Sequence, residues 1–148
     1  LALKLTTWPG RIHQIEQGKI ITYRKNITIL DGAHNEDSAY VLDKYLNKKS
    51  LGKWNLIIGM LRNRDVKDFV NIFKSHINKV FAITIPDIES SYSPDQIIVK
   101  LKKSGLQVLP AKDLENALQI ADKEVPLLIT GSLYLAGYTL RFNDTKIN

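Results

Sequence analysis

The sequence predicts an α/β fold with a mainly parallel sheet, helices on both of its faces and an antiparallel edge. Three observations lead to this prediction. Short apolar runs alternate with longer segments of helical period, and turn residues separate the two kinds of segment along the chain. The chain has 148 residues, 44% of them hydrophobic, which suits one domain with its own core. Because parallel strands need crossover connections, the intervening helices are expected to cover the sheet.

The first predicted strands form one side of this sheet. Residues 11–17 and 19–23 have the pattern of two strands joined by a turn at Gly18. Residues 27–30 are a short β-branched run that ends at Asp31. We expect the first two of these strands to add the antiparallel edge.

From residue 36 onward, helices and strands alternate regularly. Asn35 is a suitable N-cap for the first helix, and the apolar residues that begin at Val66 follow an i, i+3, i+4, i+7, i+11 pattern. The predicted helices are residues 36–48, 66–77, 94–103, 114–123 and 133–141, and the predicted strands are residues 55–59, 80–85, 106–109 and 127–130. Ligands of open parallel sheets bind at the carboxyl ends of strands, so functional groups are expected there.

The composition excludes several kinds of chemistry. The chain has no cysteine, which excludes disulfide scaffolds, thiolate metal sites and cysteine nucleophiles, and which allows a reducing compartment. His13 and His76 have no partners at metal-ligand spacing. No apolar run approaches the roughly 18 residues of a membrane-spanning helix, and the first residues do not form a signal peptide. Because the sequence does not start with Met, we expect it to be part of a longer protein.

The net charge of +6 lies entirely in the first half of the chain. Residues 1–74 contain 13 basic and 7 acidic side chains, whereas the remainder contains 8 of each. This asymmetry favours an anionic partner, either nucleic acid or a phosphorylated small molecule. The basic residues are 16 Lys and only 5 Arg, without an Arg-rich tract or an aromatic RNA-binding motif, so nucleic acid is the weaker choice. A solvated, Lys-rich surface accounts for most of the charge.

Four polar residues near predicted strand ends are candidates for ligand binding. Asp31 and His34 follow the strand at 27–30, Ser132 follows the last strand, and Arg11 comes after a Pro-Gly turn. Together they would suit a ribose hydroxyl pair or a phosphate. Each also has a structural interpretation, because Asp31 could satisfy backbone amides, His34 could be a polar loop residue, Ser132 could cap a helix and Arg11 could pair with a surface acid. Both interpretations stay open at this point.

Several motifs of known chemistry are missing. Residues 130–134 do not form the G-x-S-x-G elbow of a hydrolase, and the sequence contains neither a Walker-type P-loop nor a G-x-G-x-x-G fingerprint. The chain therefore cannot build its own Walker-type ATP site. Residues 62–65 could contact a nucleotide, but we favour Asp65 as a helix N-cap with solvated arginines beside it.

Four motifs, taken in order, resemble the C-terminal domain of folylpolyglutamate synthase and dihydrofolate synthase, the folate branch of the Mur ligase superfamily. They are Trp8-Pro9-Gly10-Arg11, Leu30-Asp31-Gly32-Ala33-His34-Asn35, Gly59-Met60-Leu61 and Gly131-Ser132-Leu133-Tyr134-Leu135-Ala136-Gly137. The resemblance implies a Rossmann-like domain over residues 1–148, with residues 1–11 as the remainder of a linker. It also implies a preceding P-loop ATPase domain, absent here, that holds the magnesium ligands and most of the folate pocket.

The resemblance further implies an ATP-dependent, cytoplasmic carboxylate-amine ligase. In this family ATP and magnesium activate a carboxyl group of folate or dihydropteroate as an acyl phosphate, and the amino group of L-glutamate attacks it. By similarity, Arg11 and Asp31 contact ATP, and His34 and Ser132 place L-glutamate. No catalytic residue or metal ligand is expected in this domain alone, so the isolated chain is expected to be inactive. Neither nucleic acid nor a membrane is an expected partner.

The chain departs from the family pattern at two positions near the motifs. Glu36 stands where a proline is common, and Tyr138 stands where an acidic residue is common. Residues 12–29 are also longer than in compact family members. Three alternatives remain, namely a non-catalytic split-gene remnant or interaction module, the C-terminal domain of another Mur-type amino-acid ligase, and a nucleotide-binding module. The sequence does not separate dihydrofolate synthase from folylpolyglutamate synthase activity.

Overall fold

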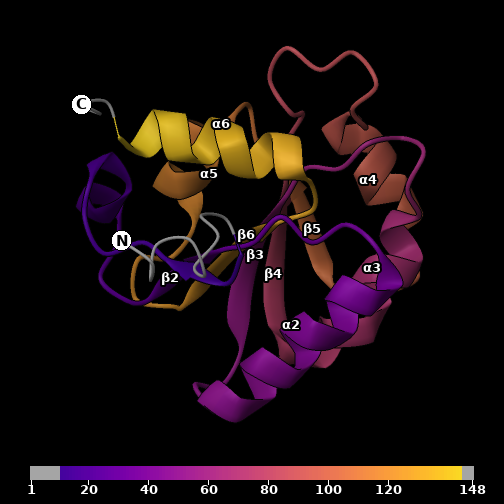
Figure 1. Ribbon diagram of the computed structural model, residues 1–148. Helices are drawn as coiled ribbons and strands as arrows, with labels where there is room; N and C mark the ends of the chain where they lie inside the picture. The colour runs from indigo at the N-terminus through magenta and orange to yellow at the C-terminus, as the bar shows by residue number, and fades with distance from the viewer. Residues whose placement is uncertain (1–10, 145–148) are drawn as a thin grey trace, which may run out of the picture.

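A single six-stranded sheet forms the centre of the computed structural model, which describes residues 11–144 (Figure 1). The strand order is β1-β2-β6-β3-β4-β5. The strands are β1 (His13–Gln14), β2 (Thr28–Leu30), β3 (Trp54–Ile58), β4 (Ile77–Ala82), β5 (Gln107–Pro110) and β6 (Leu127–Thr130). β1 pairs with β2 in antiparallel fashion, and all the other neighbours are parallel. The predicted fold class, including the antiparallel edge, is confirmed.

Each α-helix begins at a polar N-cap whose side chain accepts a backbone hydrogen bond. The helices are α2 (Glu36–Lys49), α3 (Val66–Phe73), α4 (Pro94–Lys100), α5 (Leu114–Ile120) and α6 (Leu133–Asn143), with the 3-10 helices η1 (Lys19–Tyr23) and η2 (Lys74–His76). Their N-caps are Asn35, Asp65, Ser93, Asp113 and Ser132. These caps satisfy amides that have no partner within the helix, so the polar residue before each apolar segment determines where the helix starts.

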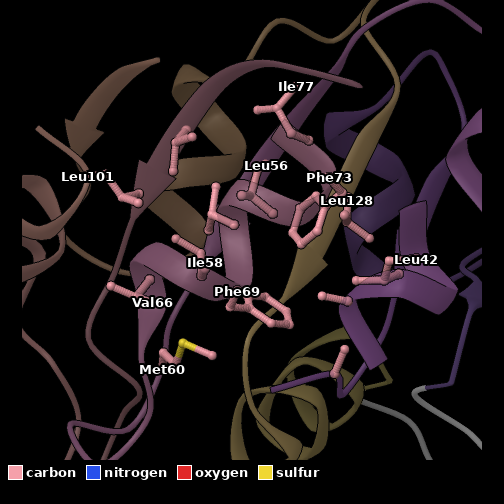
Figure 2. Close-up of a cluster of buried hydrophobic side chains, with 14 of the residues drawn as sticks. Leu42, Leu56, Ile58, Met60, Val66, Phe69, Phe73, Ile77, Leu101 and Leu128 are labelled. Carbon is pink, nitrogen blue, oxygen red and sulfur yellow. The ribbon is translucent and has the colours of Figure 1, made fainter. Parts of the chain in front are cut away.

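The sheet separates two hydrophobic cores. Leu56 and Ile58 of β3 face one core together with α2, α3 and α4, whereas Ile57 faces the other core with η1, α5 and α6. Figure 2 shows the first core, in which Phe69 and Phe73 pack edge to face with their ring centroids 5.3 Å apart. Burial of each such side chain contributes about 1.5–3 kcal/mol, so these two layers hold the strand ends in place.

The antiparallel edge is much shorter than predicted, and one predicted strand is wrong. Residues 19–23 form η1, and only His13 and Gln14 of the predicted strand at 11–17 pair with β2. The reason is a contact with α6. The side chain of Asn143 accepts a hydrogen bond from the Ile20 N–H (2.8 Å) and donates one to the Gln17 carbonyl (3.0 Å). This tertiary contact overrides the β-propensity of the segment.

Three predicted helices end earlier than expected. The helix predicted for 66–77 ends at Phe73, and Ile77 already belongs to β4. α4 ends at Lys100 and α5 ends at Ile120. Ile77 keeps the apolar period of α3 but is buried in the first core from the sheet, so periodicity alone placed it on the wrong element.

A buried arginine joins the amino end of β2 to the segment before β6. Arg24 donates from Nε to Thr28 Oγ1 (2.9 Å), from Nη1 to the Asp122 carbonyl (3.2 Å) and from Nη2 to the Val125 carbonyl. Its side chain is 7% exposed, and burial lowers the pKa of Arg24. The arginine therefore links two parts of the chain that are about a hundred residues apart.

Within residues 11–144, none of the helices has both the length and the apolar character needed to span a bilayer.

Candidate functional site

The carboxyl ends of β2, β6 and β3 meet in the middle of the sheet. The Asp31 N–H donates to the Ile129 carbonyl (3.0 Å), and the Gly59 N–H donates to the Thr130 carbonyl (3.4 Å). The Thr130 hydroxyl donates to the Ala33 carbonyl (3.5 Å). These bonds bring two of the sequence motifs, at 30–35 and 131–137, side by side as the predicted topology requires.

Glycine is required where these strand ends approach each other. Gly131 has a φ of +124°, and a Cβ on this residue would lie 2.3 Å from the Gly59 carbonyl oxygen. A Cβ on Gly32 would lie 2.5 Å from the Leu133 side chain. A side chain at Gly131 would therefore both strain the backbone and push β3 and β6 apart.

Asp31 is a buried carboxyl group at the end of β2, with 5% of the residue exposed. Its Oδ1 accepts a hydrogen bond from the Ile12 N–H (3.2 Å). Burial raises the pKa of Asp31 above that of an ordinary aspartate, while the Ile12 amide, the Arg11 charge, the Ala33 amide and His34 oppose this rise in that order. The carboxylate oxygens can accept several hydrogen bonds, so this group retains capacity for a ligand.

Arg11 is the first residue of the described chain. Ile12, which follows it, has a φ of +43°, a conformation that a β-branched residue adopts at a cost of about 1–3 kcal/mol. The same bend directs the Ile12 N–H to the Asp31 carboxylate. Arg11 is exposed, and its positive charge opposes the rise in the pKa of Asp31. The rest of its motif, Trp8 to Gly10, lies outside the described residues.

His34 is half-buried in the turn between β2 and α2. Its Nδ1 lies 3.0 Å from the Gly32 carbonyl. Because a carbonyl only accepts, Nδ1 must carry the proton, and Nε2 is left for another partner. The His34 N–H bonds to the hydroxyl of Ser38, which also takes part in the capping box with Asn35. The imidazole is therefore held by the Gly32 carbonyl, and the His34 backbone is held by the first turn of α2.

Ser132 is buried at the end of β6 and is the N-cap of α6. Its Oγ accepts the Tyr134 N–H at 2.9 Å, so the structural interpretation of this serine is confirmed. The cap uses the oxygen only as an acceptor, which leaves the hydroxyl proton available. Leu133 and Tyr134, at the start of α6, are 60% and 57% exposed.

A small pocket lies between the start of α2 and the start of α3. Its volume is about 210 Å³, and its walls are formed by residues 34–36 and by residues 63–65, 68 and 69. His34 is thus the candidate residue that reaches this pocket, whereas Arg11, Asp31 and Ser132 do not line it.

The pocket wall includes Arg64, an arginine that the sequence predicts to be solvated. Asp65 is the N-cap of α3, as predicted, and accepts the Asp68 N–H at 2.9 Å. Arg62 is exposed but donates to the carbonyls of Glu89 (2.8 Å) and Ser91 (3.0 Å), so it is not simply solvated. Arg64 is half-buried. The feature of the sequence that could have identified Arg64 as a pocket residue is its position just after the carboxyl end of β3, where ligand-binding groups are common.

A larger hollow of about 1060 Å³ lies between the β1–η1 segment and the end of α6. None of the four candidate residues lines it. An eleven-residue helix is roughly 16 Å long, so this hollow is remote from Ser132 at the opposite end of α6. The chemistry expected at the strand ends therefore does not involve it.

In the part of the chain that the structure describes, no group of three or more His, Asp or Glu side chains could hold a metal ion.

The sheet order and the helices on both faces define a Rossmann-like α/β domain. The family model for the C-terminal domain of dihydrofolate synthetase matches residues 14–142, and the chain belongs to this family. The resemblance inferred from the four motifs is therefore confirmed.

The chain is also similar to two curated proteins. Dihydrofolate synthetase of Saccharomyces cerevisiae is 24% identical over 155 residues, and folylpolyglutamate synthase of Lacticaseibacillus casei is 25% identical over 141 residues. These matches cover 95% and 90% of the chain, but only 36% and 29% of the two proteins. The chain thus spans about a third of the length of these relatives.

A solved structure shares the fold. It is a bifunctional folylpolyglutamate synthase/dihydrofolate synthase with Mn, AMPPNP and L-glutamate bound, and it matches with a TM-score of 0.71 at 22% identity. The match covers 90% of this chain and 31% of that one. At this identity, the similarity shows a common fold.

Proposed function

We propose that this chain is the part of an ATP-dependent ligase that contacts ATP and L-glutamate while a folate or dihydropteroate carboxyl group is converted to an amide. The observation that carries the proposal is the buried Asp31 carboxyl group, bonded to the Ile12 N–H at the point where β2 and β6 end. Family membership and the nucleotide and L-glutamate bound to the similar solved structure support it.

Asp31 and Arg11 suit the two polar parts of a nucleotide. The Asp31 carboxylate can accept hydrogen bonds from ribose hydroxyls, and the exposed Arg11 fork can donate to phosphate oxygens. The positive charge of Arg11 also favours the ionised form of Asp31, which is the form that accepts hydrogen bonds. His34 and Ser132 would then orient L-glutamate, through imidazole Nε2 and the hydroxyl proton that the helix cap leaves available.

The bond that forms is an amide. The carboxyl carbon, activated as an acyl phosphate, is attacked by the glutamate nitrogen, the carbon–oxygen bond to phosphate breaks, and the nitrogen loses a proton. Magnesium, when bound, neutralises phosphate charge in such a reaction. The contribution of this chain is positioning, because an amine held next to an acyl phosphate reacts much faster than one in free solution.

The proposed reaction requires a second domain. The sequence has no P-loop, and the chain spans only about a third of its relatives. We therefore propose a partner P-loop ATPase domain that supplies the phosphate-binding loop, the magnesium ligands and most of the folate pocket. Closure of the two domains would exclude water from the acyl phosphate.

Glutamate-dependent phosphate release from ATP, measured with dihydropteroate and with a reduced folate, tests the proposal. This chain alone, the P-loop domain alone, and the two mixed or joined would be compared. We expect activity only in the combination, and we expect Arg11→Ala to abolish most of it. The matched control is Lys25→Ala, which removes an exposed charge elsewhere. Silence in every combination of folded proteins would instead favour a remnant or a ligase for another substrate.

A further inference from the structure

The amino ends of the five parallel strands lie together at the end of the domain opposite the candidate site (Figure 1). β2, β6, β3, β4 and β5 run in the same direction, so the segments that lead into them share one edge of the sheet. Neighbouring segments also bond to each other, because the Lys25 N–H donates to the Lys123 carbonyl (3.0 Å) and Lys74 Nζ donates to the Ser104 carbonyl (3.0 Å). We call this surface the amino-end face, and it comprises residues 24–27, 48–53, 74–79, 102–106 and 122–126.

The amino-end face carries most of the positive charge of the domain. It contains ten basic residues and only two acidic ones, whereas the rest of residues 11–144 contains nine basic and thirteen acidic residues. Its lysines are all exposed except Lys74, which is half-buried. They are Lys25, Lys48, Lys49, Lys53, Lys74, Lys79, Lys102, Lys103 and Lys123. The positive excess seen in the sequence therefore lies mainly on the side of the sheet that the proposed nucleotide and amino-acid contacts do not use.

Helix ends account for only part of this charge. α2, α3 with η2, α4 and α5 all end at the amino-end face, and a helix C-terminus carries about half a negative charge. Four such ends offset roughly two of the positive charges. Lys25, Lys53 and Lys79 do not belong to the last turn of any helix. Within residues 11–144 none of the lysines of this face forms an ion pair, so most of the charge is open to an external partner.

An apolar side chain lies among these lysines. Leu51 is 46% exposed and stands between Lys49 and Lys53 in the turn that follows α2. Ser50 (φ +49°) and Gly52 (φ +79°) bend the backbone on either side of it. Figure 1 shows the end of α2, which leads into this turn, projecting at this end of the domain. Leu51 is therefore placed to make the first apolar contact with anything that the lysines attract.

We propose that the amino-end face binds the surface of an anionic lipid membrane, with its lysines at the headgroups and Leu51 in the interface. Five strands spaced about 4.8 Å apart distribute the lysines over roughly 20 Å, which suits an extended charged surface better than a single phosphate. Nucleic-acid recognition relies on arginine and on stacking aromatic side chains, and this face exposes neither within the described residues. This partner goes beyond what the family resemblance implies.

Co-sedimentation of the 148-residue chain with lipid vesicles tests the proposal. We expect saturable binding to vesicles of phosphatidylcholine and phosphatidylglycerol, which weakens as salt is added, and no binding to phosphatidylcholine alone. The double variant Lys53→Gln/Lys79→Gln should bind about 25-fold more weakly, because each lysine near an anionic surface contributes about fivefold. The matched control Lys67→Gln/Lys112→Gln removes the same charge from exposed positions outside the face, and it should weaken binding less than about threefold. Circular dichroism shows that each variant is folded.

Leu51→Ser separates a membrane from a nucleic acid as the partner. It should weaken vesicle binding by about fivefold, because an apolar contact with the interface is lost, and should leave the affinity for duplex DNA unchanged. Val99→Ser, at an exposed apolar position of α4 outside the face, is the control and should change neither affinity.

Three results would overturn the proposal. Equal losses in the two double variants would show that net charge alone causes the binding. Vesicle binding that is unchanged in Leu51→Ser would remove the apolar contact. Duplex DNA or RNA bound as tightly as the vesicles would make nucleic acid the better partner. The proposed ligase function is tested separately, because Lys53→Gln/Lys79→Gln should keep full activity in the active combination of domains whether or not vesicles bind.

Discussion

Two buried charged residues lie at opposite ends of β2, and they differ in how fully their hydrogen-bonding groups are used. Arg24, at the amino end, donates to Thr28 and to two carbonyl oxygens across the chain. Asp31, at the carboxyl end, accepts hydrogen bonds from the backbone amides of Ile12 and Ala33, and the charge of the exposed Arg11 acts on it. A buried charge whose partners all come from the fold stabilises the fold, whereas one with spare capacity at a strand end is suited to a ligand.

Replacement of Gly131 should have the largest effect on stability, because this glycine lies where β6 approaches β3 at the carboxyl ends of the strands. We expect Gly131→Ala to lower the free energy of unfolding by about 4 kcal/mol, because a positive φ costs ~1–3 kcal/mol and an overpacked contact costs a similar amount. Gly105→Ala is the matched control, since Gly105 also has a positive φ but nothing lies within 4 Å of the position that a Cβ would take there. Denaturant unfolding of both variants provides the measurement. Equal losses would show that the approach of Gly131 to Gly59 is not tight.

Replacement of Arg24 tests whether the buried charge at the amino end of β2 stabilises the fold. Replacement of Arg24 by Met should lower the free energy of unfolding by about 3 kcal/mol, because hydrogen bonds to a charged group contribute ~1.5–3 kcal/mol and buried carbonyls lose their donors. Ligase activity per folded molecule, in the active combination of domains, should not change. Lys25→Met, at the exposed neighbouring position, should leave stability within about 0.5 kcal/mol of the wild type. A stable Arg24→Met protein would contradict the structural role that separates the two ends of β2.

Asp31→Asn should have the opposite effects to Arg24→Met, because it should lower activity and raise stability. We expect activity to fall by about a hundredfold, which corresponds to ~2.7 kcal/mol of lost stabilisation of the reacting complex. Stability at neutral pH should rise, because burial raises the pKa of Asp31 and the ionised group therefore opposes folding. Asp37→Asn, in the exposed first turn of α2, is the control for activity.

The pH dependence of stability checks the sign of this effect. Between the unfolded pKa of Asp31 and its raised pKa in the folded state, the folded protein binds more protons, so the free energy of unfolding falls as pH rises. Above this interval the Asn variant should be more stable than the wild type, and below it the difference from this carboxyl group should vanish. A variant that is less stable at neutral pH would show that Asp31 supports the fold as Arg24 does.

The sequence predicted the parallel part of the fold because each signal there is local. A polar cap precedes each helix, and the strand ends carry the motifs that the structure brings together at Asp31 and Ser132. The edge at residues 19–23 was predicted wrongly because its conformation depends on Asn143, more than a hundred residues away. Arg64 was missed as a pocket residue for the same reason. The pocket that Arg64 lines also includes residues at the start of α2, and neither the pattern of the loop nor its composition reports that arrangement.

The Ser132 hydroxyl can serve both the fold, as the cap of α6, and the proposed binding of L-glutamate. Ser132→Ala should lower the free energy of unfolding by about 1 kcal/mol through loss of the α6 cap. Ser93→Ala removes the equivalent cap of α4, away from the strand ends at β2 and β6, and should have a similar effect on stability. If the Ser132 hydroxyl also donates to L-glutamate, only Ser132→Ala should raise the KM for L-glutamate, by about tenfold, while the KM for ATP stays constant. Equal kinetics in the two variants would make Ser132 a helix cap alone, and of the two residues proposed to orient L-glutamate only His34 would remain.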